Sequence, residues 1–253
     1  MGQVLLETRR LRKAFGGVEA VSNVDLAVLE GDVHALIGPN GAGKTTFFNL
    51  LTGSLRPDGG RITFQVTDIT GRSPHEICRM GIARSFQRAS IFPKLSVFEN
   101  IRVAALAREG KSFRLCPRAK SLAGREVEDL LETVGLSDQA DLPADSLAHG
   151  DKKRLELAIA LASRPKLLLL DEPTAGMSPD ETKSTMALVA RLARERGITV
   201  VFTEHDMTVV FGIARRLTVM HQGQIIADGS PAQVRESARV QQVYLGEAGW
   251  FWS

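Results

Sequence analysis

Cysteine and the larger aromatic residues are scarce in this chain of 253 residues, which has two cysteines, two tryptophans and one tyrosine. Cys78 and Cys116 have neither the spacing of a metal site nor that of a disulfide framework, so we expect a reduced, cytosolic setting. Long hydrophobic runs are also missing. No stretch of about 18 apolar residues is present, and we therefore expect no membrane-spanning helix.

An excess of charge of one sign is missing as well. The chain has 32 lysine and arginine residues against 29 aspartate and glutamate residues, a formal net charge of +3 with the two signs interspersed. So small an excess does not favour a nucleic-acid partner, and we expect none. The composition, 43% hydrophobic and 24% charged residues, is that of an ordinary globular protein. The length suits one large α/β domain or two small ones.

A glycine-rich stretch at residues 38–46 fits the phosphate-binding loop pattern of glycine, four residues, glycine, lysine, then serine or threonine. The apolar run before it, 33–37, predicts a buried strand, and the apolar run after it, 47–51, predicts a helix. The glycines would let backbone N–H groups converge on a phosphate, Lys44 would reach the β- and γ-phosphates, and the Thr45 hydroxyl would bind Mg²⁺. The alternative is a glycine-rich turn between packed elements. The candidate ATP-binding residues of this loop are Gly38, Pro39, Asn40, Gly41, Ala42, Gly43, Lys44, Thr45 and Thr46.

A pair of acidic residues follows the most apolar run of the chain. Residues 166–170 predict a central strand that is covered on both faces, and Asp171 and Glu172 come directly after it. A carboxylate at the end of such a strand is where a P-loop ATPase holds Mg²⁺, so Asp171 is the predicted metal ligand. Glu172 should point elsewhere and is the predicted base that accepts a proton from an attacking water. The alternative is two acidic residues at an exposed strand end.

Strands and helices alternate along most of the chain, which predicts a mostly parallel sheet with helices on both faces. Residues 4–8 and 24–28 predict an antiparallel start. Between residues 96 and 162 the periodicity is helical, and this block should form a subdomain inserted in the alternation. Within it, the basic segment 111–125 is interpreted as a surface loop, and a helix is expected over 152–162. The predicted fold class is α/β: a P-loop NTPase with a RecA-like parallel sheet, an N-terminal antiparallel β subdomain and an inserted α-helical subdomain.

Several motifs occur in a particular order along nearly the whole chain. In sequence order they are residues 38–46, Gln87, residues 147–151, residues 167–173 and His205. This order resembles that of the nucleotide-binding subunits of ABC transporters. Within that family the chain is most similar to the importer subunits for branched-chain amino acids. The residues that carry this closer similarity are 15–21, 47–53, 81–87, 155–156, 175–179 and 244–247.

The resemblance implies roles for single residues. Phe15 would stack on adenine, with a plain core or surface phenylalanine as the alternative. Gln87 would contact Mg²⁺ or the attacking water and sense a permease, unless it only caps a loop. His205 would touch the γ-phosphate, with a structural histidine as the alternative. The implied catalytic residues are Glu172, His205, Gln87 and Lys44, and the implied metal ligands are Thr45, Gln87 and Asp171.

The signature loop of the family, usually Leu-Ser-Gly-Gly-Gln, is altered in this chain. Its counterparts are Leu147, Ala148, His149, Gly150 and Asp151. The serine hydroxyl that would donate to the γ-phosphate is absent at Ala148, whereas Gly150 and the following helix N-terminus retain backbone donors. The resemblance implies that this signature loop completes the ATP site of a second subunit arranged head to tail.

The resemblance also implies the organisation and partners of the chain. Residues 1–253 would form a single ABC ATPase domain, with a RecA-like and β core at 1–87 and 163–235, a helical subdomain at 88–162 and a C-terminal extension at 236–253. ATP and Mg²⁺ are the implied cofactors. The implied partners are a second ABC ATPase subunit (identical or different), transmembrane permease subunits and, indirectly, a periplasmic or extracellular substrate-binding protein.

These partners would place the chain at the cytoplasmic face of the inner or plasma membrane, attached through the permease. Its implied function is to power the import of branched-chain or related small amino acids, amides or urea. The alternatives are the ATPase of a lipopolysaccharide-type exporter and a soluble ABC ATPase outside transport.

Overall fold

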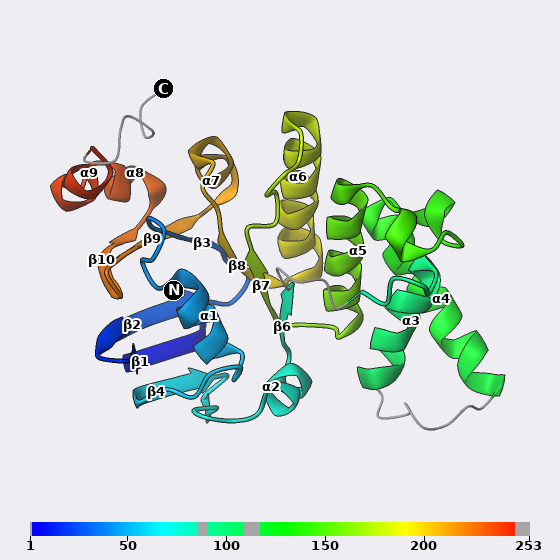
Figure 1. Ribbon diagram of the computed structural model, residues 1–253, viewed down its shortest axis with the longest axis horizontal. Coiled ribbons are helices and arrows are strands. Elements are labelled where there is room, and N and C mark those ends of the chain that lie inside the picture. The colour runs from blue at the N-terminus through cyan, green and yellow to red at the C-terminus, as the bar shows by residue number, and fades with distance from the viewer. Residues whose placement is uncertain (1, 86–90, 109–116, 246–253) are drawn as a thin grey trace.

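The described part of the chain folds into two β-sheets with helices around them (Figure 1). A computed structural model describes residues 2–85, 91–108 and 117–245, so Gln87 lies outside the described residues. The elements in chain order are β1 (Val4–Phe15), β2 (Val18–Leu29), β3 (Val33–Ile37), α1 (Lys44–Leu51), β4 (Gly59–Phe64), β5 (Thr67–Asp68), α2 (Pro74–Met80), β6 (Ile82–Ser85), α3 (Val97–Arg108), α4 (Pro117–Val134), the 3₁₀ turns η1 (Ser137–Gln139) and η2 (Ala144–Ser146), α5 (His149–Ala162), β7 (Leu167–Asp171), α6 (Pro179–Arg196), β8 (Thr199–Thr203), α7 (Met207–Ile213), β9 (Arg216–His221), β10 (Gln224–Gly229), α8 (Pro231–Arg235) and α9 (Ala238–Leu245).

The smaller sheet is antiparallel, with the strand order β2-β1-β4-β5. It buries one face, on which Leu6, Val28 and Ile62 are inaccessible to solvent. The predicted antiparallel start is confirmed, and both strands extend beyond the predicted 4–8 and 24–28. The length of β1 cannot be predicted from its sequence, because its last residues are mostly polar. An exposed strand end does not require apolar and polar residues to alternate.

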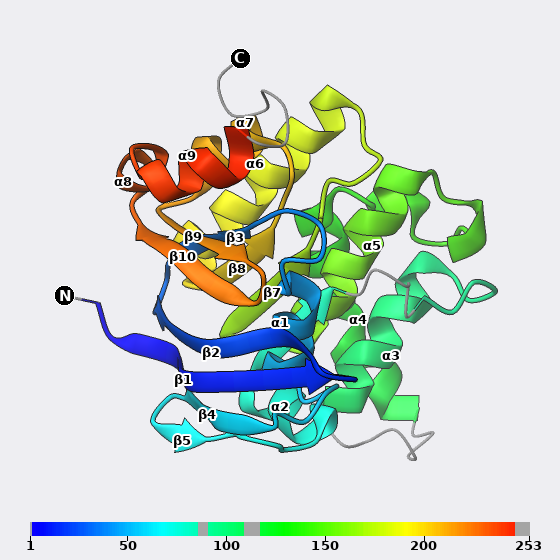
Figure 2. The ribbon, with the colours of Figure 1, turned by 60° about the vertical axis from the view of Figure 1, so that its left-hand side comes forward.

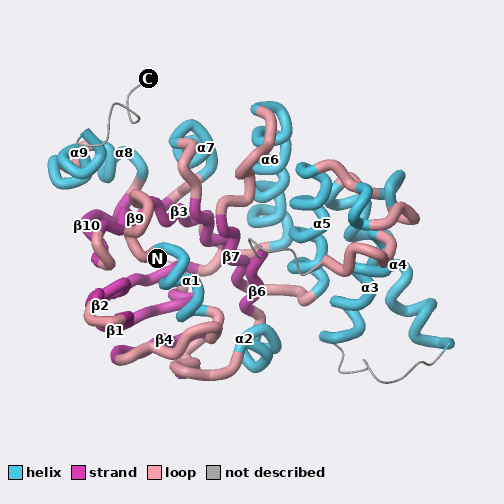
Figure 3. The backbone as a smooth tube through the Cα atoms, viewed as in Figure 1, coloured by secondary structure: helices cyan, strands magenta, loops and turns pink. Residues whose placement is uncertain are grey.

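The larger sheet has the strand order β10-β9-β3-β8-β7-β6 (Figure 3). The strands from β9 to β6 pair in parallel, and β10 is an antiparallel strand at one edge. A mostly parallel sheet, as predicted, brings the carboxyl ends of its strands to one edge, where loops carry functional residues.

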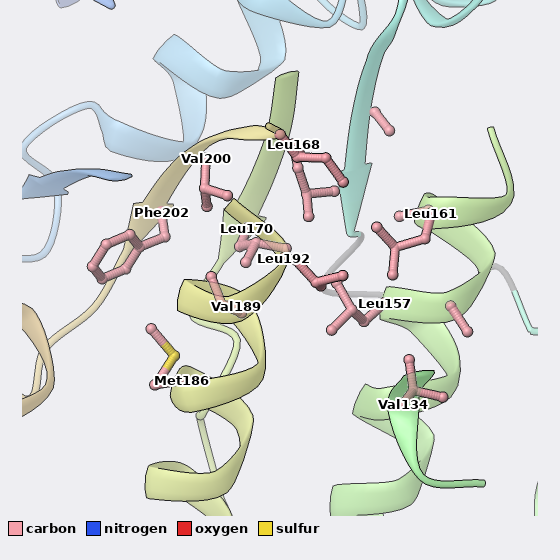
Figure 4. Packing of buried hydrophobic residues seen from close by; sticks show 14 of the residues in the cluster. Val134, Leu157, Leu161, Leu168, Leu170, Met186, Val189, Leu192, Val200 and Phe202 are labelled. Atoms are coloured by element: carbon pink, nitrogen blue, oxygen red, sulfur yellow. The ribbon is translucent and has the colours of Figure 1, made fainter. Parts of the chain in front are cut away.

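Both faces of the larger sheet are covered, and β7 shows this most clearly because all of its residues are buried. Leu168 and Leu170 belong to the core cluster that includes side chains of α5 and α6 (Figure 4). Leu167 and Leu169 belong to the opposite cluster, which includes α1 and the smaller sheet. Each leucine buried in this way contributes about 2 kcal/mol of transfer free energy, so β7 is fixed firmly beneath the acidic residues that follow it.

Helix α1 lies between the two sheets (Figure 2). Phe47, Phe48, Leu50 and Leu51 are fully buried, or nearly so, in the same cluster as Leu6 and Ile62. The helix is therefore held from several sides, and its N-terminus has a fixed direction relative to the edge of the larger sheet.

Helices α3, α4 and α5 lie between β6 and β7 in sequence and pack against one another (Figure 1). The expected surface loop over 111–125 is wrong for residues 117–125, which belong to α4. Proline is favoured at the first helical position, and the alanine, leucine, lysine, arginine and glutamate that follow are strong helix formers. The intrinsic helix propensity of these residues therefore explains the helix, although the segment has no apolar stripe that would indicate one.

Helix α5 begins at His149, before the predicted start at residue 152. Its N-cap, Ala148, makes no side-chain capping bond, so the sequence carries no start signal at this point. Among the helices that the structure describes, none is both long enough and apolar enough to cross a membrane.

Candidate functional site

The phosphate loop, residues 38–46, connects β3 to α1 and is pressed against neighbouring strands. Gly43 has a φ of +103°, and a Cβ there would collide with the carbonyl oxygen of Ala20 in β2. A Cβ at Gly38 would collide with the carbonyl oxygen of Met220 in β9. Both positions therefore require glycine, and the path of the loop is set by strands from both sheets.

The N-terminus of α1 is open to an anion. Its N-cap, Gly43, provides no side-chain capping bond, and no acidic residue stands in the first turn. The amides of a first helical turn have no partner inside the helix and carry partial positive charge, so this end favours a phosphate. The site thus fits the nucleotide phosphates that the sequence predicts there.

Lys44 points back along the phosphate loop and donates to the carbonyl oxygens of Gly38 and Pro39, the latter at 3.1 Å. Burial lowers the pKa of Lys44, and the carboxylates of Glu172 and Asp171 oppose that shift. The ammonium group therefore lies between the phosphate loop and the acidic residues, as a lysine that binds β- and γ-phosphates requires.

Asp171 ends β7 and is held by hydrogen bonds from two neighbouring strands. Its Oδ1 accepts a hydrogen bond from Thr203 Oγ1 of β8 at 2.8 Å, and its Oδ2 accepts one from Arg84 of β6 at 2.7 Å. Arg84 also donates to Asn49 Oδ1 in α1 at 2.6 Å. The guanidinium group thereby connects the predicted metal ligand with the helix that follows the phosphate loop.

Glu172 adopts a left-handed backbone conformation with a φ of +49°, which is uncommon outside glycine. Its N–H donates to both oxygen atoms of Thr203, the carbonyl at 3.2 Å and Oγ1 at 3.1 Å. Its Oε1 accepts a hydrogen bond from His205 Nε2 at 3.0 Å. The structure therefore brings Glu172 and His205 together.

Glu204 is a buried carboxylate that the sequence interpretation did not identify. Its side-chain oxygens accept from Thr174, at 3.0 Å from N and 2.6 Å from Oγ1, and from the N–H of His205 at 3.2 Å. It joins the segments that follow β7 and β8, on which Glu172 and His205 lie. The sequence does contain a signal for Glu204, because this carboxylate comes directly after the apolar strand β8. The same kind of signal led to the prediction of Asp171.

The signature loop, residues 147–151, contacts α6 and the segment before it within the same chain. His149 Nε2 lies 3.0 Å from the carbonyl oxygen of Ala175. Gly150 is buried, and a Cβ on it would lie only 2.5 Å from Glu181 Oε1. Asp151 Oδ2 accepts from the side-chain amide of Gln139 at 3.0 Å. The start of α5 is thus packed tightly against the start of α6.

Phe15 is half exposed at the end of β1, with the ammonium group of Lys13 5.5 Å from the centre of its ring. It pairs with Val18 of β2, two residues before the Ala20 carbonyl that abuts Gly43. Phe15 therefore lies on the pair of strands that contacts the phosphate loop through Ala20, and its ring is partly open to solvent.

Within the described residues, no group of three or more histidine, cysteine, aspartate or glutamate residues could hold a metal ion. The candidate ligands are the single carboxylate of Asp171 at the end of β7 and the Thr45 hydroxyl in the first turn of α1. This donor set fits Mg²⁺, which is commonly held by one or two carboxylates together with phosphate oxygens of a substrate.

Comparison with known proteins places the chain in a family. The sequence model described as "ABC transporter" matches residues 21–175, which include the phosphate loop, the signature loop and both acidic residues. The chain belongs to the ABC transporter ATP-binding family. It is an ATPase of that family, and its fold is that of an ATP-binding cassette.

Relatives of this ABC ATPase cover nearly its full length. It is 41% identical to the branched-chain amino acid transport ATP-binding protein LivG of Salmonella typhimurium, over 98% of this chain and 100% of LivG. It is 37% identical to the lipopolysaccharide export ATP-binding protein LptB of Acidithiobacillus ferridurans, over 96% of this chain and 95% of LptB. The ADP conformation of MJ1267, a cassette of an ABC transporter, matches with a TM-score of 0.86, 32% identity and coverage of 96% and 99%. A second model, "Branched-chain amino acid ATP-binding cassette transporter", matches residues 224–249.

Proposed function

We propose that this ABC ATPase hydrolyses ATP to power the import of branched-chain or related small amino acids. One observation supports the hydrolytic part above all: the phosphate loop, Asp171 and the Glu172–His205 pair meet at one edge of the larger sheet. The C-terminal match at 224–249 and the 41% identity with LivG support the choice of cargo.

In the proposed reaction, the amides at the start of α1 and the Lys44 ammonium group bind the ATP phosphates. Thr45 and Asp171 would hold Mg²⁺, with Gln87 as a further ligand, and the bound ion would supply charge neutralisation at the phosphates. Glu172 takes a proton from water as the water oxygen bonds to the γ-phosphorus, and the bond from that phosphorus to the ADP oxygen breaks. His205, already bonded to Glu172, would contact the γ-phosphate.

We further propose that two such domains enclose ATP head to tail, with the signature loop of each completing the site of the other. Ala148 offers no hydroxyl, so backbone N–H groups at the start of α5 would serve the γ-phosphate there. Phe15 would stack on adenine. The helical subdomain, proposed as 88–162, would carry the signature loop toward the partner site.

The proposed partners in the membrane are permease subunits. A cavity of about 380 Å³ opens between α2, β6, α3 and α5, with Ile77, Ala83, Ala104 and Ile159 among its mostly apolar lining. This cavity would receive a permease helix and convert closure of the ATP dimer into motion of the permease. The chain would then act at the cytoplasmic membrane face, supplied with cargo by an external substrate-binding protein. Lipopolysaccharide export is the second candidate, favoured by the 37% identity with LptB.

A transport assay with three forms of the chain tests the proposal. The wild-type ATPase, reconstituted with its permeases and binding protein in liposomes, should drive ATP-dependent uptake of labelled leucine. Glu172→Gln should still bind ATP and accumulate as an ATP-bound dimer, but should hydrolyse about a thousandfold more slowly and give no uptake. Lys44→Ala should lose ATP turnover.

Wild-type-like hydrolysis in Glu172→Gln would contradict the role of the base, and wild-type turnover in Lys44→Ala would contradict the phosphate loop assignment. A different result would favour lipopolysaccharide export over amino acid import. In that case ATP hydrolysis would depend on Lys44 and would be stimulated by lipopolysaccharide in the complex, but no amino acid would be taken up.

A further inference from the structure

His149 connects the signature loop to the segment that carries the proposed base. It is the first residue of α5, its side chain is exposed, and its Nε2 lies 3.0 Å from the Ala175 carbonyl oxygen. A carbonyl oxygen only accepts hydrogen bonds, so Nε2 must carry the hydrogen. The ring lies over Gly176, where a Cβ would be 3.1 Å from Nε2 and the φ is +78°. The positive φ favours glycine at position 176, and a side chain there would press against the ring of His149.

The link continues from Ala175 to the proposed base. The Ala175 N–H donates to the carbonyl oxygen of Glu172 at 3.2 Å, which closes a turn that starts at the base. Glu172 holds a left-handed φ of +49°, and its side chain is bonded to His205. A backbone in this uncommon conformation persists only when neighbouring contacts hold it. The N–H of Glu172 is bonded to Thr203, and the His149–Ala175 bond lies at the other end of the turn that begins at Glu172.

We propose that His149 is a positioning residue that holds the 172–176 turn and thereby couples the signature loop to the base of its own chain. The inference rests on the proposed function, in which the signature loop of one subunit touches the ATP held by the other. ATP bound at the partner's phosphate loop would then fix His149, and His149 would fix Glu172 for the ATP held by its own phosphate loop. One side chain would connect the two composite sites.

Three substitutions of His149 separate the hydrogen bond from the bulk of the ring. His149→Ala should lower kcat for ATP hydrolysis about tenfold with little change in KM, because the base is misplaced while the phosphate loop is intact. His149→Gln should restore most of kcat, since its amide nitrogen can occupy the place of Nε2. His149→Asn is the matched control: it has the same amide group but is too short, and kcat should stay low. The melting temperature of all three variants should stay close to that of the wild type, because the side chain is exposed.

Mixed dimers show through which site His149 acts. One copy carries Glu172→Gln, so that only the base of the other copy works. His149→Ala placed in the copy with the working Glu172 should lower kcat about tenfold. The same substitution in the Glu172→Gln copy, whose signature loop touches the ATP being hydrolysed, should lower kcat much less, because backbone N–H groups rather than the His149 side chain serve the γ-phosphate there.

The reverse order of effects would overturn the inference and would instead show that His149 acts on the partner's nucleotide. Equal losses in both arrangements, or full activity of His149→Ala, would overturn it as well. Each of these results leaves the proposed function intact. A wild-type chain without Lys44-dependent hydrolysis would remove the proposed function, and this inference with it.

Discussion

Arg84 is the residue whose importance is least visible in the sequence. Its side chain is 6% exposed and that of Asp171 1% exposed, so the ion pair between them is almost fully removed from water. The guanidinium group also lies over the ring of Phe48, 5.6 Å from its centre, and donates to Asn49. Asp171 is thus held in place before any metal or nucleotide binds.

Replacing Arg84 with methionine should destabilise the protein by about 3 kcal/mol, because the buried carboxylate of Asp171 would lose its cationic partner and keep only the hydrogen bond from Thr203. ATP hydrolysis should fall as well, since the predicted metal ligand loses a hydrogen bond that orients it. Urea unfolding measures the first effect and a steady-state ATPase assay the second.

The double variant Arg84→Met, Asp171→Asn provides the control. It should be more stable than Arg84→Met alone, because it leaves no unpaired buried charge. A double variant as unstable as the sum of the two single variants would show that the ion pair contributes no coupling energy.

At the scale of elements, the capping boxes at the starts of α2 and α6 mark the beginnings of these helices in the sequence. The hydroxyl oxygens of Ser73 and Ser178 each accept from the N–H of the glutamate three residues on, and the N–H of each serine donates in return to the side chain of that glutamate. Helices α2 and α6 each begin with a proline directly after that serine and end directly before a glycine, which are the usual start and stop signals of a helix in a sequence. Helices α4 and α5 lack such signals, and there the predicted bounds were wrong.

The capping boxes of α2 and α6 allow a matched comparison. Ser178→Ala and Ser73→Ala should each cost about 1 kcal/mol of stability, because each leaves an amide of the first helical turn without its partner. Only Ser178→Ala should also lower ATP turnover, since its partner Glu181 packs against Gly150 of the signature loop. Unfolding free energies and kcat of the two variants check both statements. Equal turnover in the two variants would mean that the contact between α5 and α6 does not matter for hydrolysis.

At the scale of the whole molecule, a buried histidine links stability to pH. His34 in β3 is fully buried, and its Nε2 lies 2.7 Å from Thr218 Oγ1 in β9. Thr218 donates to Asp228, so it must accept from Nε2–H, and Nδ1 is left buried without a partner among the described residues. Burial lowers the pKa of His34 from 6.5 to about 4, with Asp228 opposing the shift and Arg216 adding to it.

The sign of the effect on stability follows from this shift. Between pH 6.5 and pH 4 the unfolded chain binds a proton at His34 that the folded chain does not, so the free energy of unfolding falls as the pH falls through that window. The loss should reach about 3 kcal/mol near pH 4. His34→Phe should remove this part of the pH dependence, as measured by urea unfolding between pH 7 and pH 4. The exposed His75→Gln is the control and should keep the wild-type slope; a wild-type slope in His34→Phe as well would contradict the assignment.

The sequence by itself determined the parts of the protein that depend on neighbours along the chain. The phosphate loop, the acidic pair after β7, the capping boxes and the order of the motifs are all contiguous or ordered in sequence, and they were enough to predict the fold class and the family. Their local backbone geometry is set by glycine, proline and side chains a few residues away.

The tertiary structure alone decided which distant residues meet. The register of β6, β7 and β8 places Arg84 and Thr203 around Asp171, and the close packing of α5 on α6 brings His149 to the Ala175 carbonyl. The sequence does not specify these pairs in advance, because strand register and helix packing depend on how the whole core fills space. The sequence was therefore enough to predict which residues form the candidate site. It was not enough to predict the contacts between distant residues that hold these side chains in position.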